Sequence, residues 1–453
     1  MKRKKTIQNP PILLPALTLL LFALTGCQPF GAQRTEKHPS PQPVATENCV
    51  TLLLPVSGPY ALITAKIIRG AQTAQREMKK DGVAVSLRTI STESPNWLTD
   101  LAALPVECAV VGGPLQANHY AMARQTGTVD TRTFFTFLPS LEHGDEGARA
   151  WRFFPGPQDQ IDALLGFAAD TLNIRAFGIF YPSDSYGVRM ANLFEQNLAA
   201  RNMLSQKASY TPSDVTSWAA AVAPLVNPIL PESGKTPIPQ TTFEALFLPD
   251  SWKSMDMLTT SLIYNGEDRL ILLGTTLWEQ GLSGKLIPNA EKYALAVFPG
   301  AWNGAARAQQ GVHNDFWTAL GYDFLYFAKN LDLTSRLTAL EISARAARCA
   351  QMPWSMAPIS WDLSGVARQK LFLFQVSPTG MTPLNPEHFA QIRIAVLQGA
   401  ALRMQGLPPL DENGNPPAPT AADRTEGHIL PLGATPQPSY KLRFPAARRQ
   451  GLP

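Results

Sequence analysis

The chain has 453 residues, of which 45% are hydrophobic and 16% are charged, a composition typical of a globular protein with a sizeable core. The formal net charge of +4 is matched by four cationic residues at positions 2–5, so the chain that follows residue 26 has a net charge of zero. This balance predicts neither a nucleic-acid partner nor an anionic surface as a partner.

The first residues have the pattern of a secretory signal peptide. A short basic stretch at 2–5 is followed by an almost wholly apolar stretch at 11–24. A membrane-spanning helix needs about 20 apolar residues, whereas this stretch is shorter and contains Pro11 and Pro15. A basic start, a short apolar stretch and small residues before the cleavage point are typical of secretory signals. We therefore expect residues 1–26 to be removed.

The sequence LTGC at 24–27 resembles the lipobox of bacterial lipoproteins, whose cysteine is acylated. The resemblance implies that Cys27 carries the lipid, palmitate included, and becomes the first residue of the mature protein. In enteric-type bacteria an aspartate in the next position favours the inner membrane, and here that residue is Gln28. The resemblance thus implies an outer-membrane anchor that faces the periplasm. The inner membrane, or the cell membrane of a Gram-positive owner, is the alternative.

Two segments are rich in proline and poor in large apolar residues, so neither can bury a core. Residues 27–48 are expected to form a tether and residues 404–453 a disordered tail. Between them, short apolar runs alternate with helix-like segments. Strands are predicted at 49–55, 83–90, 108–114, 132–139, 176–182, 243–250, 269–276 and 293–300.

The first helix is predicted between the first two strands. Apolar residues recur there at helical spacing from Ile63 to Met78, and Gly82 ends the pattern. Strand–helix alternation over this length implies parallel sheets with helices on both faces. Because the pattern is too long for one sheet and restarts near residue 174, we expect two doubly wound α/β lobes. Such sheets bind ligands at the carboxyl ends of their strands.

Four segments, in order, resemble type I periplasmic binding proteins, the Leu/Ile/Val-binding class. They are LLLPVSGPYALITAKIIRGAQTA (52–74), AVVGGPLQ (109–116), WRFFPGPQDQIDALLGFAAD (151–170) and GIFYPSDSYGVRMANLFEQNLAARN (178–202). The resemblance implies discontinuous lobes, with the chain crossing between them near residues 153, 300 and 360. Lobe 1 is expected at 49–154 and 300–358, and lobe 2 at 155–299 and 359–403.

A narrower resemblance covers residues 245–280. The sequence LLGTTLWEQ at 272–280 is similar to the penicillin-binding-protein activator lipoproteins. Those lipoproteins carry this fold at their carboxyl end and stimulate a peptidoglycan synthase from the outer membrane. They also have a helical-repeat domain ahead of it, and here the linker at 27–48 takes its place.

The cleft candidates implied by the resemblance follow the predicted strands: Ser57, Gln116, Ser140, Tyr186, Asp250, Thr275 and Thr276. In amino-acid-binding members, polar groups of lobe 1 hold the carboxylate, and the first three candidates are expected to do so. Tyr186 matches an aromatic residue that closes over the ligand. The acid that would take the ammonium is absent, because Thr276 stands in its place. Asp250 is a substitute for it, or else a helix cap.

Three tryptophans follow strand ends in the second half: Trp252, Trp278 and Trp302. They are either core residues or, if exposed, anchors for a protein partner or a sugar chain. The proline-rich insertion at 227–240 is either a surface excursion or a contact specific to a partner.

The chain has no nucleophile elbow, phosphate-binding loop or zinc-protease motif, so we predict no enzymatic activity, no cofactor and no metal. In the sheet order that the resemblance implies, the first and third strands are neighbours. Cys49 and Cys108 each lie six residues before a proline and therefore at matching depth. Adjacent strands are about 4.8 Å apart, so a Cys49–Cys108 disulfide is possible, which leaves Cys349 as a free thiol.

Two functions fit these patterns. The first is a lipid-anchored regulator that contacts a peptidoglycan synthase, favoured by LLGTTLWEQ, by the anchor and by the missing acid. The second is a solute-binding lipoprotein of an ABC transporter, for amino acids or another small polar ligand, favoured by the absent repeat domain. A solute binder needs polar groups that converge in a closable cleft, whereas a regulator needs an exposed and fixed patch.

Overall fold

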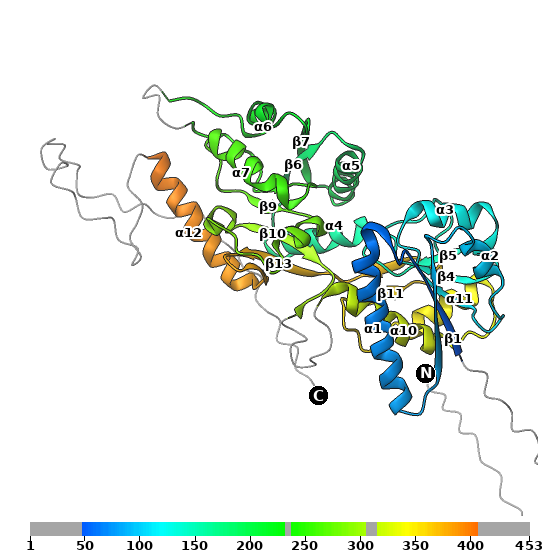
Figure 1. Ribbon diagram of the computed structural model, residues 1–453. Coiled ribbons are helices and arrows are strands. Elements are labelled where there is room, and N and C mark those ends of the chain that lie inside the picture. The colour runs from blue at the N-terminus through cyan, green and yellow to red at the C-terminus, as the bar shows by residue number, and fades with distance from the viewer. Residues whose placement is uncertain (1–47, 232–236, 305–314, 406–453) are drawn as a thin grey trace, which may run out of the picture. The chain divides into compact units, whose positions relative to one another are not determined.

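The computed structural model describes residues 48–231, 237–304 and 315–405 (Figure 1). The predicted anchor Cys27 lies outside these residues, as do nearly all of the tether and the tail. The described strands form a five-stranded sheet, a seven-stranded sheet and a two-stranded hairpin. This confirms the predicted architecture of parallel sheets with helices. No helix in the described part of the chain has the length and apolar character needed to span a membrane.

The five-stranded sheet is parallel throughout and has the order β2-β1-β3-β4-β5. Its strands are β1 (Asn48–Leu54), β2 (Val85–Ser91), β3 (Val110–Gly112), β4 (Thr133–Thr136) and β5 (Ala150–Arg152). The first four lie in predicted apolar runs. The inner strands β3 and β4 are wholly buried, as expected for parallel strands covered on both faces.

Five helices pack with this sheet and complete the first lobe: α1 (Ala61–Lys80), α2 (Trp97–Ala102), α3 (Ala117–Gln125), α10 (Phe316–Leu331) and α11 (Ala339–Cys349). The predicted stripe of α1 is buried. Helices α1 and α10 meet backbone to backbone. A Cβ atom on Gly70 would lie 1.9 Å from the Thr318 carbonyl oxygen, and one on Gly321 would lie 1.9 Å from that of Ile67.

The seven-stranded sheet has the order β14-β13-β10-β9-β8-β6-β7. Its parallel strands are β6 (Ala176–Pro182), β7 (Leu204–Tyr210), β8 (Ala245–Phe247), β9 (Ile271–Leu273) and β10 (Ala296–Gly300). Two antiparallel strands, β13 (Phe372–Ser377) and β14 (Gly380–Pro383), extend one edge. The sheet forms the second lobe with α4 (Pro157–Leu165), α5 (Ser185–Ala200), α6 (Trp218–Val226), α7 (Met255–Tyr264), α8 (Glu279–Leu282) and α12 (Pro386–Met404).

The chain passes between the sheets after β5 and after β10. It passes again after the hairpin of β11 (Ile359–Trp361) and β12 (Ala367–Gln369). The fully buried Phe153 lies in the first passage. Its ring centroid is 5.3 and 5.1 Å from those of Phe324 and Phe327 in α10, and 5.9 Å from that of Trp361 in β11. One aromatic core thus joins segments that are distant in sequence.

Cys49 and Cys108 form a disulfide, with the two Cα atoms 4.4 Å apart. This is the pair that the sequence indicated, because β3 lies directly beside β1. Cys349 is free and half-buried. The disulfide lies at the amino-terminal edge of the first sheet.

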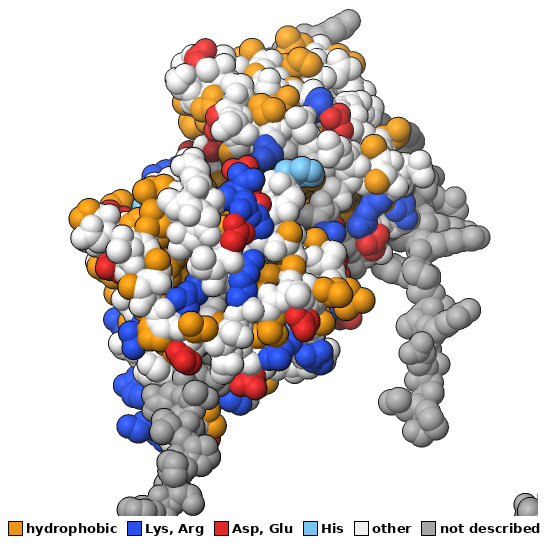
Figure 2. Space-filling view, turned by 90° about the vertical axis from the view of Figure 1, so that its right-hand side faces the viewer, with side chains coloured by type: hydrophobic (Ala, Val, Ile, Leu, Met, Phe, Trp, Pro, Cys, Tyr) orange, Lys and Arg blue, Asp and Glu red, His pale blue; other side chains and the backbone are white. Residues whose placement is uncertain are grey.

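Lys and Arg side chains are frequent over the lower half of the face shown in Figure 2.

Candidate functional site

The first lobe presents Ser57, Gln116 and Ser140 at the carboxyl ends of its strands. Ser57 and Ser140 are exposed. Gln116 is the N-cap residue of α3 but makes no capping bond, and its Oε1 is buried without a hydrogen-bond partner among the described residues. A buried polar atom left unpaired costs about 1–3 kcal/mol. Gln116 is therefore the first-lobe candidate best prepared to accept a bond from a ligand.

On the second lobe, Tyr186 lies in the first turn of α5 and packs against the core. Burial raises the pKa of Tyr186 above its ordinary value. Thr275 is fully buried, and its Oγ1 accepts a bond from the Leu277 amide at 3.4 Å. The aromatic ring expected to close over a ligand is thus held by its own lobe.

Asp250, the predicted substitute acid, is bonded within the lobe. Its Oδ2 accepts a hydrogen bond of 2.6 Å from the Tyr210 hydroxyl, and its Oδ1 one of 2.5 Å from the Ser251 amide. Burial, and then this bond to the carboxylate, raise the pKa of Tyr210, which stays a donor. The Asp250 carboxylate is therefore hydrogen-bonded to the neutral Tyr210 hydroxyl of its own lobe, and that oxygen is not free for a ligand.

Thr276, which stands where an acid was expected, is fixed by α4. Its amide and its hydroxyl both donate to Oε1 of Gln160, at 3.0 and 3.3 Å. Gln160 is only 5% exposed. These bonds satisfy the polar groups of Thr276 from within the second lobe.

Glu279 is an acid of the second lobe that sequence reasoning did not single out. It opens α8, directly after the LLGTTLW stretch. Burial, and then repulsion from Asp315, raise the pKa of its carboxyl group to about 7. Asp315 itself precedes α10 and forms an ion pair with Lys66 of α1 at 3.3 Å. The motif was recognisable in the sequence, but nothing local indicated that its glutamate would be partly buried near Asp315.

A buried ion pair connects the two lobes at the first passage. Nη1 of Arg152, in β5, lies 2.6 Å from Oδ2 of Asp159, in α4, and the two side chains are 6% and 0% exposed. The Asp159 carboxylate also accepts a 2.7 Å bond from the Gly156 amide and a 3.0 Å bond from the Gln369 amide. The pair is therefore well satisfied, which is the condition under which a buried ion pair is tolerated.

The β11–β12 hairpin is bonded to the same pair. Arg152 donates to the Ala367 carbonyl, and Glu146 accepts from the Ala367 amide at 3.0 Å. The Trp361 indole donates to the Arg152 carbonyl at 3.2 Å. We call this network, made of Arg152, Asp159, Glu146 and the hairpin, the clamp. It cross-links the first and third passages between the lobes.

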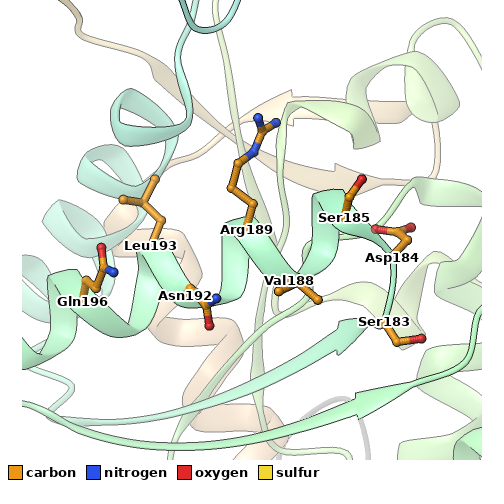
Figure 3. A pocket seen from close by; sticks show the side chains of 8 residues that line it. All are labelled: Ser183, Asp184, Ser185, Val188, Arg189, Asn192, Leu193 and Gln196. Atoms are coloured by element: carbon orange, nitrogen blue, oxygen red, sulfur yellow. The ribbon is translucent and has the colours of Figure 1, made fainter. Parts of the chain in front are cut away.

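A shallow hollow of about 740 Å³ runs along α5 and the turn before it (Figure 3). It is lined by Ser183, Asp184, Ser185, Val188, Arg189, Asn192, Leu193 and Gln196. Asp184 caps the helix by accepting a 2.7 Å bond from the Gly187 amide. In Figure 3 the Arg189 guanidinium projects clear of the other labelled side chains. Tyr186 is not among the lining residues, so this hollow is distinct from the predicted cleft.

The tryptophans do not form an exposed partner surface. Trp278 is fully buried, so its assignment as a surface candidate is wrong. A Cβ atom on Gly274 would lie 2.3 Å from its ring, which shows that the glycine makes room for the indole. Trp252 packs against this core, 5.6 Å from Trp278 between ring centroids. Trp302 is partly buried against the core of the first lobe.

Exposed apolar side chains gather instead at the insertion 227–240 and the end of α7. Ile229 and Ile238 pair through main-chain bonds of 2.9 and 2.8 Å. Pro237 approaches Gly266, where an added Cβ would lie 2.0 Å from its carbonyl oxygen. The exposed fractions are 55% for Ile229, 74% for Leu230, 46% for Ile263 and 72% for Tyr264. We call these four residues the hairpin patch, after the paired insertion at 227–240, which is a different segment from the β11–β12 hairpin of the clamp.

No family model matches this chain, and no curated protein matches it. Solved structures do. The C-domain of LpoA (YraM) from Haemophilus influenzae, a regulator of PBP1A, matches with a TM-score of 0.52 and 13% identity, over 74% of this chain and 100% of that domain. A putative branched-chain amino acid ABC transporter protein from Rhodospirillum rubrum matches with a TM-score of 0.53 and 11% identity, over 75% and 100%.

The fold is that of a type I periplasmic binding protein. This confirms the fold that the sequence predicted. Full-length LpoA from H. influenzae also matches, with a TM-score of 0.52 and 14% identity, over 75% of this chain but 59% of LpoA. At these identities the matches show the fold alone, and proteins with both of the predicted functions share it.

Proposed function

We propose that the protein is a non-enzymatic regulator of a peptidoglycan synthase, anchored in the outer membrane through Cys27 and facing the periplasm. The observation that carries the proposal is the internal bonding of the second lobe. Asp250 and Thr276 are each bonded to another side chain of that lobe. The predicted substitute acid, Asp250, is thus already hydrogen-bonded to Tyr210 and is not free to compensate a buried ammonium ion.

The clamp supports the same proposal. A solute binder closes by bending at the passages between its lobes. Here Arg152 and Asp159 join β5 to α4 through a buried bond of 2.6 Å, and the hairpin is bonded to both. A clamp of this kind favours fixed lobes, which suits a protein that presents a surface rather than one that encloses a solute.

The hairpin patch is the proposed contact for the synthase. Leu230 and Tyr264 are 74% and 72% exposed, and large exposed apolar side chains are typical anchors of protein interfaces. The decisive experiment measures binding of a purified synthase to the mature protein and to a Leu230→Glu/Tyr264→Glu variant. We expect the variant to bind at least about tenfold more weakly, because interface anchors contribute more than about 1.4 kcal/mol.

The matched control is Leu204→Glu/Leu286→Glu, which changes two leucines of the same lobe that are 74% and 82% exposed. The control should bind the synthase like the unchanged protein. Equal weakening in both variants would assign the loss to added negative charge. Undiminished binding of the first variant would remove the hairpin patch from the interface, and absence of binding by the unchanged protein would remove the proposed function.

One observation favours the alternative, a solute-binding lipoprotein of an ABC transporter. Gln116 keeps a buried, unpartnered Oε1 at a strand end, which a solute that donates a hydrogen bond would satisfy. A thermal-shift screen with amino acids and small polar solutes tests this function. A saturable rise in melting temperature that is lost in Gln116→Leu would support the alternative and displace the regulator.

A further inference from the structure

The end of α1 lies beside the point at which the chain enters the first sheet. Helix α1 connects β1 to β2, and these neighbouring strands are parallel, with Asn48 paired to Val85. A helix that connects two parallel strands must return to the edge where both strands begin. Lys79 and Lys80, the last two residues of α1, therefore lie at this edge, and both are exposed.

Helix α10 brings a further cation to the same edge. Near the start of the two helices, Lys66 pairs with Asp315 at 3.3 Å, and further along the Tyr326 hydroxyl donates to Glu77 at 3.4 Å. The helices thus run side by side in the same direction. Lys329, in the last turn of α10, is consequently near the end of α1.

Helix α11 adds two arginines. Nη1 of Arg345 donates to the carbonyl oxygens of Leu331 and Asp332, at 3.0 and 2.7 Å, which fixes α11 against the end of α10. Arg348, one turn later, is exposed. Both arginines line a shallow hollow of about 530 Å³ beside Leu331.

Together these three helix ends form a surface that we call the basic face. It comprises residues 76–82, 329–332 and 345–349. Its six cations are Arg76, Lys79, Lys80, Lys329, Arg345 and Arg348, and its three carboxylates are those of Glu77, Asp81 and Asp332. The face therefore has a net charge of +3, although the residues after position 26 have a net charge of zero.

We propose that the basic face rests on the anionic headgroups of the membrane that holds the lipid anchor. This inference rests on the anchoring part of the proposed function. The occupant follows from charge and position, because the cations lie where a chain tethered at Cys27 enters the fold. Cations near an anionic membrane surface add electrostatic attraction to the hold of a lipid anchor. The face belongs wholly to the first lobe, so it leaves the hairpin patch available to a partner.

The test uses residues 28–453, which lack the anchor but keep every described residue and contact. Binding is measured by co-sedimentation with vesicles of phosphatidylcholine that contain 30% phosphatidylglycerol, and with vesicles of phosphatidylcholine alone. Each cation near an anionic surface strengthens binding about fivefold. We expect Lys79→Gln/Lys80→Gln, which removes two cations, to bind the anionic vesicles about 25-fold more weakly, and high salt to weaken binding of the unchanged protein.

Lys253→Gln/Lys285→Gln is the matched control, because both lysines are exposed and belong to the second lobe. It should bind like the unchanged protein. Equal weakening in both variants, or equal binding to both kinds of vesicle, would overturn the proposal. Binding to heparin but not to vesicles would assign the face to an anionic polymer and also overturn it. None of these outcomes depends on the synthase, which is tested separately.

Discussion

At the residue scale, Glu279 makes stability depend on pH. The pKa of its carboxyl group is raised from 4.5 to about 7 by burial and then by Asp315. Between these values the folded protein holds a proton that the unfolded chain has released, so the free energy of unfolding falls as the pH rises through this window, by at most about 3 kcal/mol. Glu279→Gln should match the unchanged protein at pH 4.5 and exceed its melting temperature at pH 8.

The exposed Glu291 provides the control for this experiment. Glu291→Gln should shift the melting temperature little at either pH, because its side chain is exposed and makes no buried contact. If Glu279→Gln brought no gain at pH 8, the carboxyl group would be solvated in the folded protein, and the argument from burial would fail.

The sequence identified the segment at 272–280 as a motif but did not indicate which of its residues would be buried. LLGTTLWEQ was recognisable as a motif, yet Trp278 is core and Glu279 has a shifted pKa. Both outcomes depend on atoms that are distant in sequence. The Trp278 indole donates to the Asp250 carbonyl at 3.0 Å, and Glu279 is repelled by Asp315. Residue type and spacing do not predict such contacts between distant segments.

At the scale of elements, the contact of α1 with α10 depends on small residues. A Cβ atom on Gly321 would lie 1.9 Å from the Ile67 carbonyl oxygen. Gly321→Ala should therefore force the helices apart and lower the free energy of unfolding by about 1–3 kcal/mol, measured by urea denaturation. Gly166→Ala is the control, because nothing lies within 4 Å of the added methyl group and the φ of −56° is helical. It should be neutral or slightly stabilising.

Most of the strands that the sequence predicted are buried on both faces, and the exception is β2, an edge strand with partly exposed residues. Strands β1, β3, β4, β6, β8, β9 and β10 each lie in a predicted apolar run. Strand β7, with the sequence LSQKASY, is an edge strand with mostly exposed residues, so it has no such run. The sequence of β5 ends in Arg152, whose burial depends on Asp159 and the hairpin. Elements whose burial depends on distant partners were the ones that sequence analysis missed.

Removal of one member of the clamp should be costly. Arg152→Ala leaves the buried Asp159 carboxylate without its cation, and loss of one partner of a buried pair costs about 3–5 kcal/mol. Arg201→Ala removes a partly exposed cation that pairs with Asp170 at 3.3 Å and should cost less than about 1 kcal/mol. Urea denaturation of both variants measures the difference. Similar losses would show that the clamp is solvated like a surface pair.

At the scale of the whole molecule, net charge and charge distribution give different answers. The balance of charges after residue 26 predicts no anionic partner, whereas the fold brings the ends of α1, α10 and α11 to one edge. The three cations of α1 lie more than 200 residues before the three of α10 and α11, so no single basic run in the sequence marks the face. The partner of such a face can be inferred only after the topology is known.

The clamp also predicts that the lobes keep a fixed separation. In a Cys349→Ser background, spin labels at Leu340→Cys in α11 and Leu204→Cys in β7, both exposed positions, report the distance between the lobes. We expect a narrow distribution that amino acids leave unchanged, because Arg152 and the hairpin bond the two passages together. Adding Arg152→Ala should broaden it. A distance that shortens when a solute is added would instead identify a closing cleft, and the solute-binding function would then replace the regulator.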